Sequence, residues 1–271
     1  MSNYLSSKFT ADQILKFMEM ARAAYESEES IKSKYGSTYR IIVAESKKTE
    51  GQCILLFDDT KKVQYIVSRG SSNLTNWIKD AEYIKTLDSK TGIYIHKGFV
   101  DSAREIYDYI LSKLNTDYTT YLTGHSLGGA ITVILHLYLM KAGFSVQQSV
   151  TFGQPMITNY DGVTTYNSIP LLRVVNKKDL VPLLPPLTYI SSESGVYRHF
   201  GEETILLKDG YYCNLDETSA EDISVSDFWA NTVAGQTSII DHIHDLYIAN
   251  IKSKLSGTTK VEYSERTDYL S

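Results

Sequence analysis

The sequence predicts an α/β protein with a mixed, mostly parallel central sheet flanked by helices. Two observations carry this prediction. Strand-like runs rich in β-branched residues alternate with helix-like runs through the middle of the chain. The longest apolar run, residues 130–140, is interrupted by Thr132 and His136 and is too short to cross a bilayer, so it indicates a buried helix and no transmembrane segment.

The N-terminal third predicts one helix and then three strands. Either Thr10 or Asp12 is placed to cap the helix, and its apolar face comprises Ile14, Leu15, Met18, Ala21 and Tyr25. The strands are expected over residues 38–46, 52–59 and 63–70, with a turn between the last two.

Alternation of helices and strands continues to the C-terminus. The expected elements are a helix over 98–114, a strand over 118–123, a helix over 127–141 that ends at Gly143, strands over 149–153 and 171–176, a hairpin over 204–215 with Asp209 and Gly210 in its turn, and a helix over 242–255. No internal repeat or Pro/Gly-rich linker divides the chain, so we expect a single domain over residues 1–271.

Composition excludes some classes of function. Of the 271 residues 42% are hydrophobic and 22% are charged, as in ordinary globular proteins, and the mild net charge of −5 gives no electrostatic case for binding nucleic acid. Cys53 and Cys213, the only two cysteines, indicate no disulfide framework. Because the N-terminus lacks the pattern of a signal peptide, the expected location is the cytoplasm, or outside the cell if a leader has been removed.

A Gly-X-Ser-X-Gly motif lies between the strand that ends at Thr123 and the buried helix after it. Its central residue, Ser126, is flanked by Gly124 and Gly128, which lack the side chains that would collide where strand and helix approach. This order is typical of a nucleophile elbow. The backbone N–H of Leu127 and the helix dipole would stabilise a negative oxygen nearby. The alternative is a tight turn that contains a serine by chance.

A serine nucleophile needs a base, and the base needs an orienting acid. In folds with a nucleophile elbow the chain order is Ser, then Asp or Glu, then His. Asp179 follows a predicted strand and precedes a proline-bounded loop, whereas Asp161 and Asp209 are weaker candidates. His242 and His244 follow Asp179 near the start of the last helix. The more exposed loop position favours His242, and His199 is a third candidate. Chain order disfavours the earlier histidines as the base: His96, His125 and His136.

Several stretches of the sequence together resemble the class 3 (fungal-type) triacylglycerol lipases. They are VSRGSSNLTNWIKDAEY (67–83), IHKGFVDSA (95–103), YLTGHSLGGA (121–130), VTFGQPMITN (150–159), RVVNKKDLVPLLPP (173–186) and SIIDHIHDLYI (238–248). The resemblance implies the α/β-hydrolase fold, with Ser126 as nucleophile, Asp179 as acid and His242 as base. His242 is favoured over His244 because Asp241-His242 matches the Asp-His pair of the family.

The same resemblance implies the remaining parts of the site. Ser71 would help to hold the oxyanion together with the Leu127 N–H, and a short helical lid would extend over about residues 72–82. The lid or substrate contacts would be Leu74, Trp77 and Ile78. The apolar loop 180–187 either lines an acyl groove or packs in the core beneath the site.

These residues imply a serine carboxylic ester hydrolase that cleaves glycerolipids and needs no metal or organic cofactor. Its partners would be a lipid or small ester substrate and, transiently, a lipid surface. A phospholipase A1 or an esterase for soluble, feruloyl-type esters is an alternative of the same chemistry. A non-catalytic lipase-like scaffold is the third class, and the complete set of Ser126, Asp179, His242 and Ser71 argues against it.

Overall fold

The structure is a computed structural model that describes residues 3–45, 52–71, 84–185, 195–216 and 237–270. Its helices are α1 (Ala11–Ala23), α2 (Glu28–Tyr35), α4 (Lys97–Ile110), α5 (Leu127–Lys141), α6 (Tyr160–Thr165) and α8 (His244–Lys252). Short 3-10 helices lie at Leu111–Lys113, Val181–Leu183, Ile240–His242 and Tyr263–Tyr269.

Most of the strands form one large sheet. Its members are β1 (Arg40–Glu45), β2 (Gln52–Asp58), β3 (Val63–Ser68), β6 (Thr119–His125), β7 (Val146–Phe152), β8 (Leu171–Asn176), β9 (Glu202–Leu206), β10 (Tyr211–Leu215) and β11 (Thr259–Lys260). Within the described residues these strands lie in chain order. The run from β3 to β9 is parallel and β1–β2–β3 and β9–β10 pair antiparallel. A separate hairpin joins β4 (Lys85–Leu87) to β5 (Tyr94–His96).

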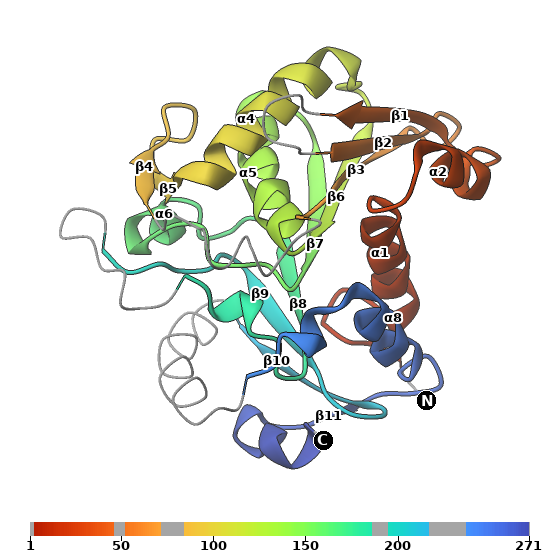
Figure 1. The fold of residues 1–271 in the computed structure, drawn as a ribbon, viewed down its shortest axis with the longest axis vertical. Coiled ribbons are helices and arrows are strands. Elements are labelled where there is room, and N and C mark those ends of the chain that lie inside the picture. The colour runs from red at the N-terminus through yellow and green to blue at the C-terminus, as the bar shows by residue number, and fades with distance from the viewer. Residues whose placement is uncertain (1–2, 46–51, 72–83, 186–194, 217–236, 271) are drawn as a thin grey trace.

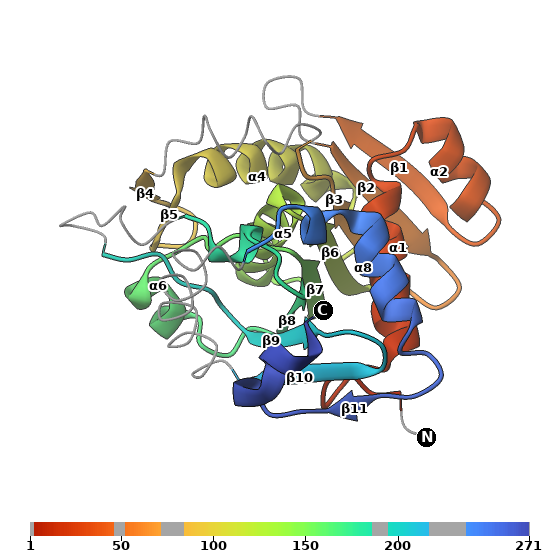
Figure 2. The same cartoon turned by 60° about the horizontal axis from the view of Figure 1, so that its bottom comes forward.

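Helices cover both faces of the sheet (Figure 1, Figure 2). On one face α4 and α5 pack against the side chains of Leu55, Ile66 and Leu122. On the other face α1 and α8 pack against Val150 and Phe152. Because successive strand residues point to opposite faces, both sides of these strands are apolar, as a doubly covered parallel sheet requires. The predicted mixed, mostly parallel sheet with flanking helices is therefore confirmed.

Helix α5 and strand β8 have the bounds that the sequence predicted, because each is buried nearly all round and ends at a sharp change of composition. All six residues of β8 are buried, and Gly143, just beyond α5, has a φ of +83°. The predicted turn of the last hairpin is also confirmed, with Asp209 at a φ of +49°.

Three predicted helices differ from the observed ones. The helix expected over 98–114 is α4, which ends at Ile110 and is followed by the 3-10 turn Leu111–Lys113. Thr10 caps α1 through a capping box with Gln13, and Tyr25 lies beyond the end of the helix. The predicted helix over 242–255 starts two residues later: the 3-10 turn ends at His242, and the extended backbone of Ile243 separates it from α8. His242 thus lies in a loop before the helix, and His244 is the first residue of α8.

The predicted lid, residues 72–82, lies outside the described residues, as do Leu74, Trp77 and Ile78. In the described part of the chain, no helix combines the length and the apolar character needed to span a bilayer.

Candidate active site

Ser126 lies on a sharp turn between β6 and α5. Its backbone has a φ of +62° and a ψ of −134°, a combination that costs free energy for any residue with a side chain. Its N–H donates to the carbonyl of Phe152 at 2.9 Å, which fixes the turn to the end of β7. A Cβ atom on Gly124 would lie 2.3 Å from the Gly128 carbonyl oxygen, so the close approach of strand and helix predicted from the motif is present.

Asp179 lies in the loop after β8 and is almost fully buried. One carboxylate oxygen accepts hydrogen bonds from His242 Nδ1 at 2.8 Å and from the Tyr247 hydroxyl at 2.7 Å. The other accepts from the Val181 N–H at 2.9 Å. Burial of this carboxylate is tolerated because each of its two oxygens accepts at least one hydrogen bond.

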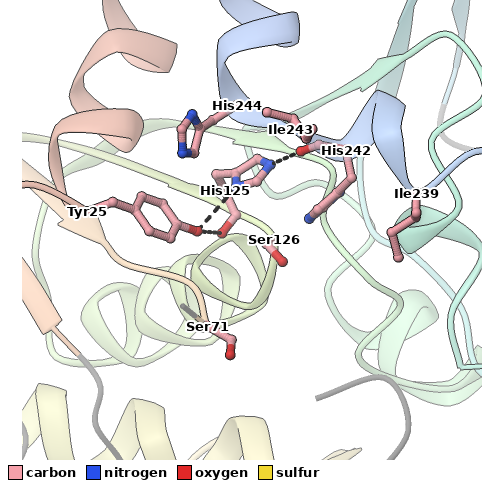
Figure 3. A pocket seen from close by; sticks show the side chains of 8 residues that line it. All are labelled: Tyr25, Ser71, His125, Ser126, Ile239, His242, Ile243 and His244. Atoms are coloured by element: carbon pink, nitrogen blue, oxygen red, sulfur yellow. Dashed lines mark hydrogen bonds between the residues drawn. The ribbon is translucent and has the colours of Figure 1, made fainter. Parts of the chain in front are cut away.

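The bond to Asp179 also determines the tautomer of His242. A carboxylate only accepts, so Nδ1 carries the proton and Nε2 is left with a lone pair. Nε2 and Ser126 Oγ are both buried, and neither has a hydrogen-bond partner among the described residues. The ring of His242 and the hydroxyl of Ser126 extend into the same space (Figure 3). Both groups therefore have unused hydrogen-bonding capacity at the point where a reacting group would enter.

Gly153, which the motif analysis did not single out, makes room for this pair. It follows β7 with a φ of +54°, and a Cβ atom there would lie 2.7 Å from both Asp179 Oδ2 and His242 Nδ1. Any side chain at this position would push the two apart. The one sign of this role in the sequence was the position of Gly153 within the VTFGQP stretch.

Other histidines of the chain lie beside groups other than Asp179. His244 Nδ1 lies 3.2 Å from Asp245, and His199 Nε2 lies 2.7 Å from the Pro182 carbonyl. His136 bonds to Ser149. The geometry thus brings His242, and not His244, to Asp179.

Tyr247, a second residue that sequence reasoning did not identify, completes the support of the acid. Burial, together with the charge of Asp179, raises the pKa of Tyr247 well above its usual value, so the phenol remains a donor. Its position on α8, one turn after His244, gave no sign of this contact, because the partner is 68 residues away in the chain.

A pocket of about 240 Å³ opens over Ser126. It is lined by Tyr25, Ser71, His125, Ser126, Ile239, His242, Ile243 and His244 (Figure 3). Ser71, the expected oxyanion residue, thus shares the pocket with Ser126. Leu127 is the first residue of α5, where an N–H has no acceptor within the helix. Val181 and Leu184, of the loop predicted as either groove or core, are buried.

Comparison with known proteins identifies the family of the chain. A family model described as "Lipase (class 3)" matches residues 65–189. The lipase of Rhizomucor miehei is 32% identical over an alignment of 204 residues, and the match covers 68% of this chain and 52% of that protein. The chain belongs to the class 3 lipase family. A second relative is the secreted mono- and diacylglycerol lipase 1 of Fusarium solani, which is 32% identical over 191 residues; the match covers 67% of this chain and 54% of that protein. The chain thus spans about half the length of these two relatives.

A solved structure of a class 3 lipase supports the fold over most of the chain. The triacylglyceride lipase of Rhizomucor miehei superposes with a TM-score of 0.67 at 26% identity, and the match covers 85% of this chain and 92% of that one.

The expected cytoplasmic location is contradicted by these relatives, since the Fusarium solani lipase is named as secreted. The expectation was wrong because it depended on leader and disulfide patterns; Cys53 and Cys213 are buried free thiols, which do not determine a compartment.

Proposed function

We propose that this chain is a serine carboxylic ester hydrolase that cleaves acyl esters of glycerolipids, with Ser126 as nucleophile, His242 as base and Asp179 as acid. The observation that carries the proposal is the buried Asp179–His242 pair beside a serine held at positive φ. A buried carboxylate bonded to Nδ1 leaves Nε2 free to take a proton, which is the arrangement that activates a hydroxyl nucleophile.

In the proposed reaction His242 Nε2 removes the Ser126 proton as Oγ attacks the ester carbonyl. The imidazolium that forms is stabilised by Asp179, which accepts its Nδ1 proton as a hydrogen bond but does not take it. The alcohol leaves with the proton from Nε2. Water then attacks the acyl-enzyme, again with His242 as base, and releases the fatty acid.

The negative oxygen of the tetrahedral intermediate would lie between the Leu127 N–H and Ser71. Both residues flank Ser126, one from the start of α5 and the other from the segment after β3. The positive end of the α5 dipole adds to this stabilisation. One donor of this kind lowers the barrier by about 3 kcal/mol.

The test of the proposal is Ser126→Ala. We expect hydrolysis of p-nitrophenyl butyrate to fall to background while the thermal midpoint of unfolding stays near that of the wild type, because only one buried hydroxyl is lost. Ser145→Ala removes a serine from the far end of the sheet, before β7, and should retain full activity. Hydrolysis by Ser126→Ala at the wild-type rate would refute the assignment.

Apolar side chains around His242 support a lipid as the substrate and transient contact with a lipid surface. Within eight residues, four aliphatic side chains are exposed to between 39% and 64%: Ile239, Ile240, Ile243 and Leu246. Ile239 and Ile243 also line the pocket over Ser126. An exposed aliphatic cluster continuous with a catalytic pocket is typical of a lipid-binding surface.

Replacement of Ile240, which is exposed and does not line the pocket, tests this surface. Transfer of an isoleucine side chain out of water contributes about 2 kcal/mol, so Ile240→Ser should reduce the rate on emulsified triacylglycerol or on phospholipid vesicles by at least about tenfold. The rate on soluble p-nitrophenyl acetate should not change. Tyr160→Ser alters an equally exposed side chain on α6 and serves as the control. Equal losses on both substrates would contradict a lipid-surface role, and activity on short soluble esters alone would favour the soluble-ester esterase.

A further inference from the structure

The segment just after α1 reaches into the active site through Tyr25. The hydroxyl of Tyr25 lies 3.2 Å from His125 Nδ1, and it accepts a hydrogen bond from the Gly70 N–H at 3.2 Å. Tyr25 itself lines the pocket over Ser126 (Figure 3). One phenol hydroxyl thus connects two segments that flank the proposed nucleophile.

His125 continues the connection to the base. Its Nε2 lies 2.8 Å from the backbone carbonyl oxygen of His242. Because a carbonyl only accepts, Nε2 must carry the proton, which leaves Nδ1 as an acceptor for the Tyr25 hydroxyl. The same hydroxyl also lies 3.4 Å from the His125 carbonyl oxygen. Burial, reinforced by the neighbouring His242, lowers the pKa of His125 well below its usual range, so the ring stays neutral and Nε2 is its one donor.

This chain of hydrogen bonds links the three parts of the proposed catalytic machinery. Gly70 immediately precedes Ser71, His125 immediately precedes Ser126, and the last acceptor is His242 itself. Gly70 and Tyr25 pack closely, since a Cβ atom on Gly70 would lie 2.3 Å from the Tyr25 hydroxyl.

Helix α1 is in turn fastened to the segment that carries the base. Arg22, near the C-terminal end of α1, pairs with Asp245 at the start of α8 at 2.8 Å. The apolar face of α1 packs against α8 through Met18, Ala21 and Tyr247. Tyr25 therefore projects from a fixed support.

We propose that Tyr25 and His125 are positioning residues, which set the Ser71 segment and the His242 loop at their working distances from Ser126. This inference rests on the proposed function. A displacement of about 1 Å at a catalytic group can cost about a hundredfold in rate, so a link of this kind affects turnover without contacting the reacting atoms. The phenol exchanges no proton in the reaction, because burial raises the pKa of Tyr25 well above its usual value.

Tyr25→Phe removes the hydroxyl and keeps the ring. We expect kcat on p-nitrophenyl butyrate to fall about tenfold, with KM changed by less than about twofold and a pH–rate profile of unchanged shape. The matched control is Tyr138→Phe, which deletes a tyrosine hydroxyl that donates to Asp88 at 2.9 Å on the other face of the sheet. That variant should lose stability but not kcat. A wild-type kcat in Tyr25→Phe, or a loss confined to KM, would overturn the proposal.

Two substitutions at His125 separate hydrogen bonding from packing. His125→Phe fills the space without a donor and should lower kcat at least as much as Tyr25→Phe does. His125→Gln places an amide N–H near the position of Nε2 and should recover most of the loss. Equal activities in the two variants would contradict a positioning bond to the His242 carbonyl.

Hydrogen–deuterium exchange tests the same link without any hydrolysis. Exchange of the backbone amides of residues 237–246 should be faster in Tyr25→Phe and His125→Phe than in the wild type and in Tyr138→Phe. Unchanged exchange would refute the link even in an active enzyme. Faster exchange in a chain that hydrolyses no ester would instead place the failure in the proposed function.

Discussion

Two buried aspartates, on loops at opposite faces of the sheet, have nearly the same hydrogen bonding but different counter-charges. Asp88 accepts from the Thr91 N–H and hydroxyl, from the Tyr138 hydroxyl and from the Arg104 guanidinium, whose Nη2 lies 2.6 Å away. Asp179 accepts from a backbone N–H, a tyrosine hydroxyl and an imidazole.

The partner decides what each carboxylate does. Arginine is charged at all accessible pH values, so Asp88 is neutralised at rest and holds the β4 segment to α4 and α5. Burial alone would raise the pKa of Asp88, but hydrogen bonds from Thr91, Arg104 and Tyr138 lower it below the usual value. The imidazole beside Asp179 becomes charged only when it takes a proton, so in the proposed reaction this carboxylate would stabilise a state that arises during turnover.

The largest expected effect comes from Asp179→Asn. The amide can present its NH₂ group toward His242 and so favour the tautomer in which Nε2 carries the proton and cannot act as a base. We expect kcat on p-nitrophenyl butyrate to fall about 10⁴-fold. The change in the free energy of unfolding should be small, because the Tyr247 hydroxyl can turn to accept from the amide NH₂ and the amide oxygen can still accept from the Val181 N–H. Kinetics and urea unfolding on the same preparation separate the two quantities. A loss of less than about tenfold would mean that Asp179 is not the orienting acid.

The parts of this molecule that the sequence predicts well are those determined by local pattern. The buried helix α5 and strand β8 are apolar runs with clear ends, and Ser126 lies in a motif whose neighbours are contiguous in the chain. Asp179 and His242 follow from chain order and from resemblance to a family, and the structure brings the two together.

The supporting contacts were not predictable, because they join residues that are distant in the chain and carry no motif of their own. The bond from Tyr25 to His125 spans 100 residues, and the bond from His125 to the His242 carbonyl spans 117. His125 could be set aside as a base by chain order, but nothing in the sequence indicated which carbonyl its ring would face. Gly153 likewise matters only because Asp179 and His242 meet beside it.

Asp88→Asn should have a smaller effect than Asp179→Asn. It should lower the free energy of unfolding and leave kcat nearly unchanged. The substitution removes the charge that faces Arg104, so we expect a loss of about 2 kcal/mol in the free energy of unfolding at pH 7, with kcat within about twofold of the wild type. Since the folded-state pKa of Asp88 is lowered, its contribution is fully present above the unfolded value of about 4 and is lost as the pH falls through the folded value. The difference in the free energy of unfolding between variant and wild type should therefore be smaller at pH 3 than at pH 7, as measured by urea unfolding.

The control is Asp108→Asn, which alters an exposed aspartate on α4 and should change the free energy of unfolding by less than about 0.5 kcal/mol at either pH. A difference for Asp88→Asn that persists at pH 3 would mean that shape, and not charge, accounts for the loss, and the contrast between the two aspartates would then hold for catalysis alone.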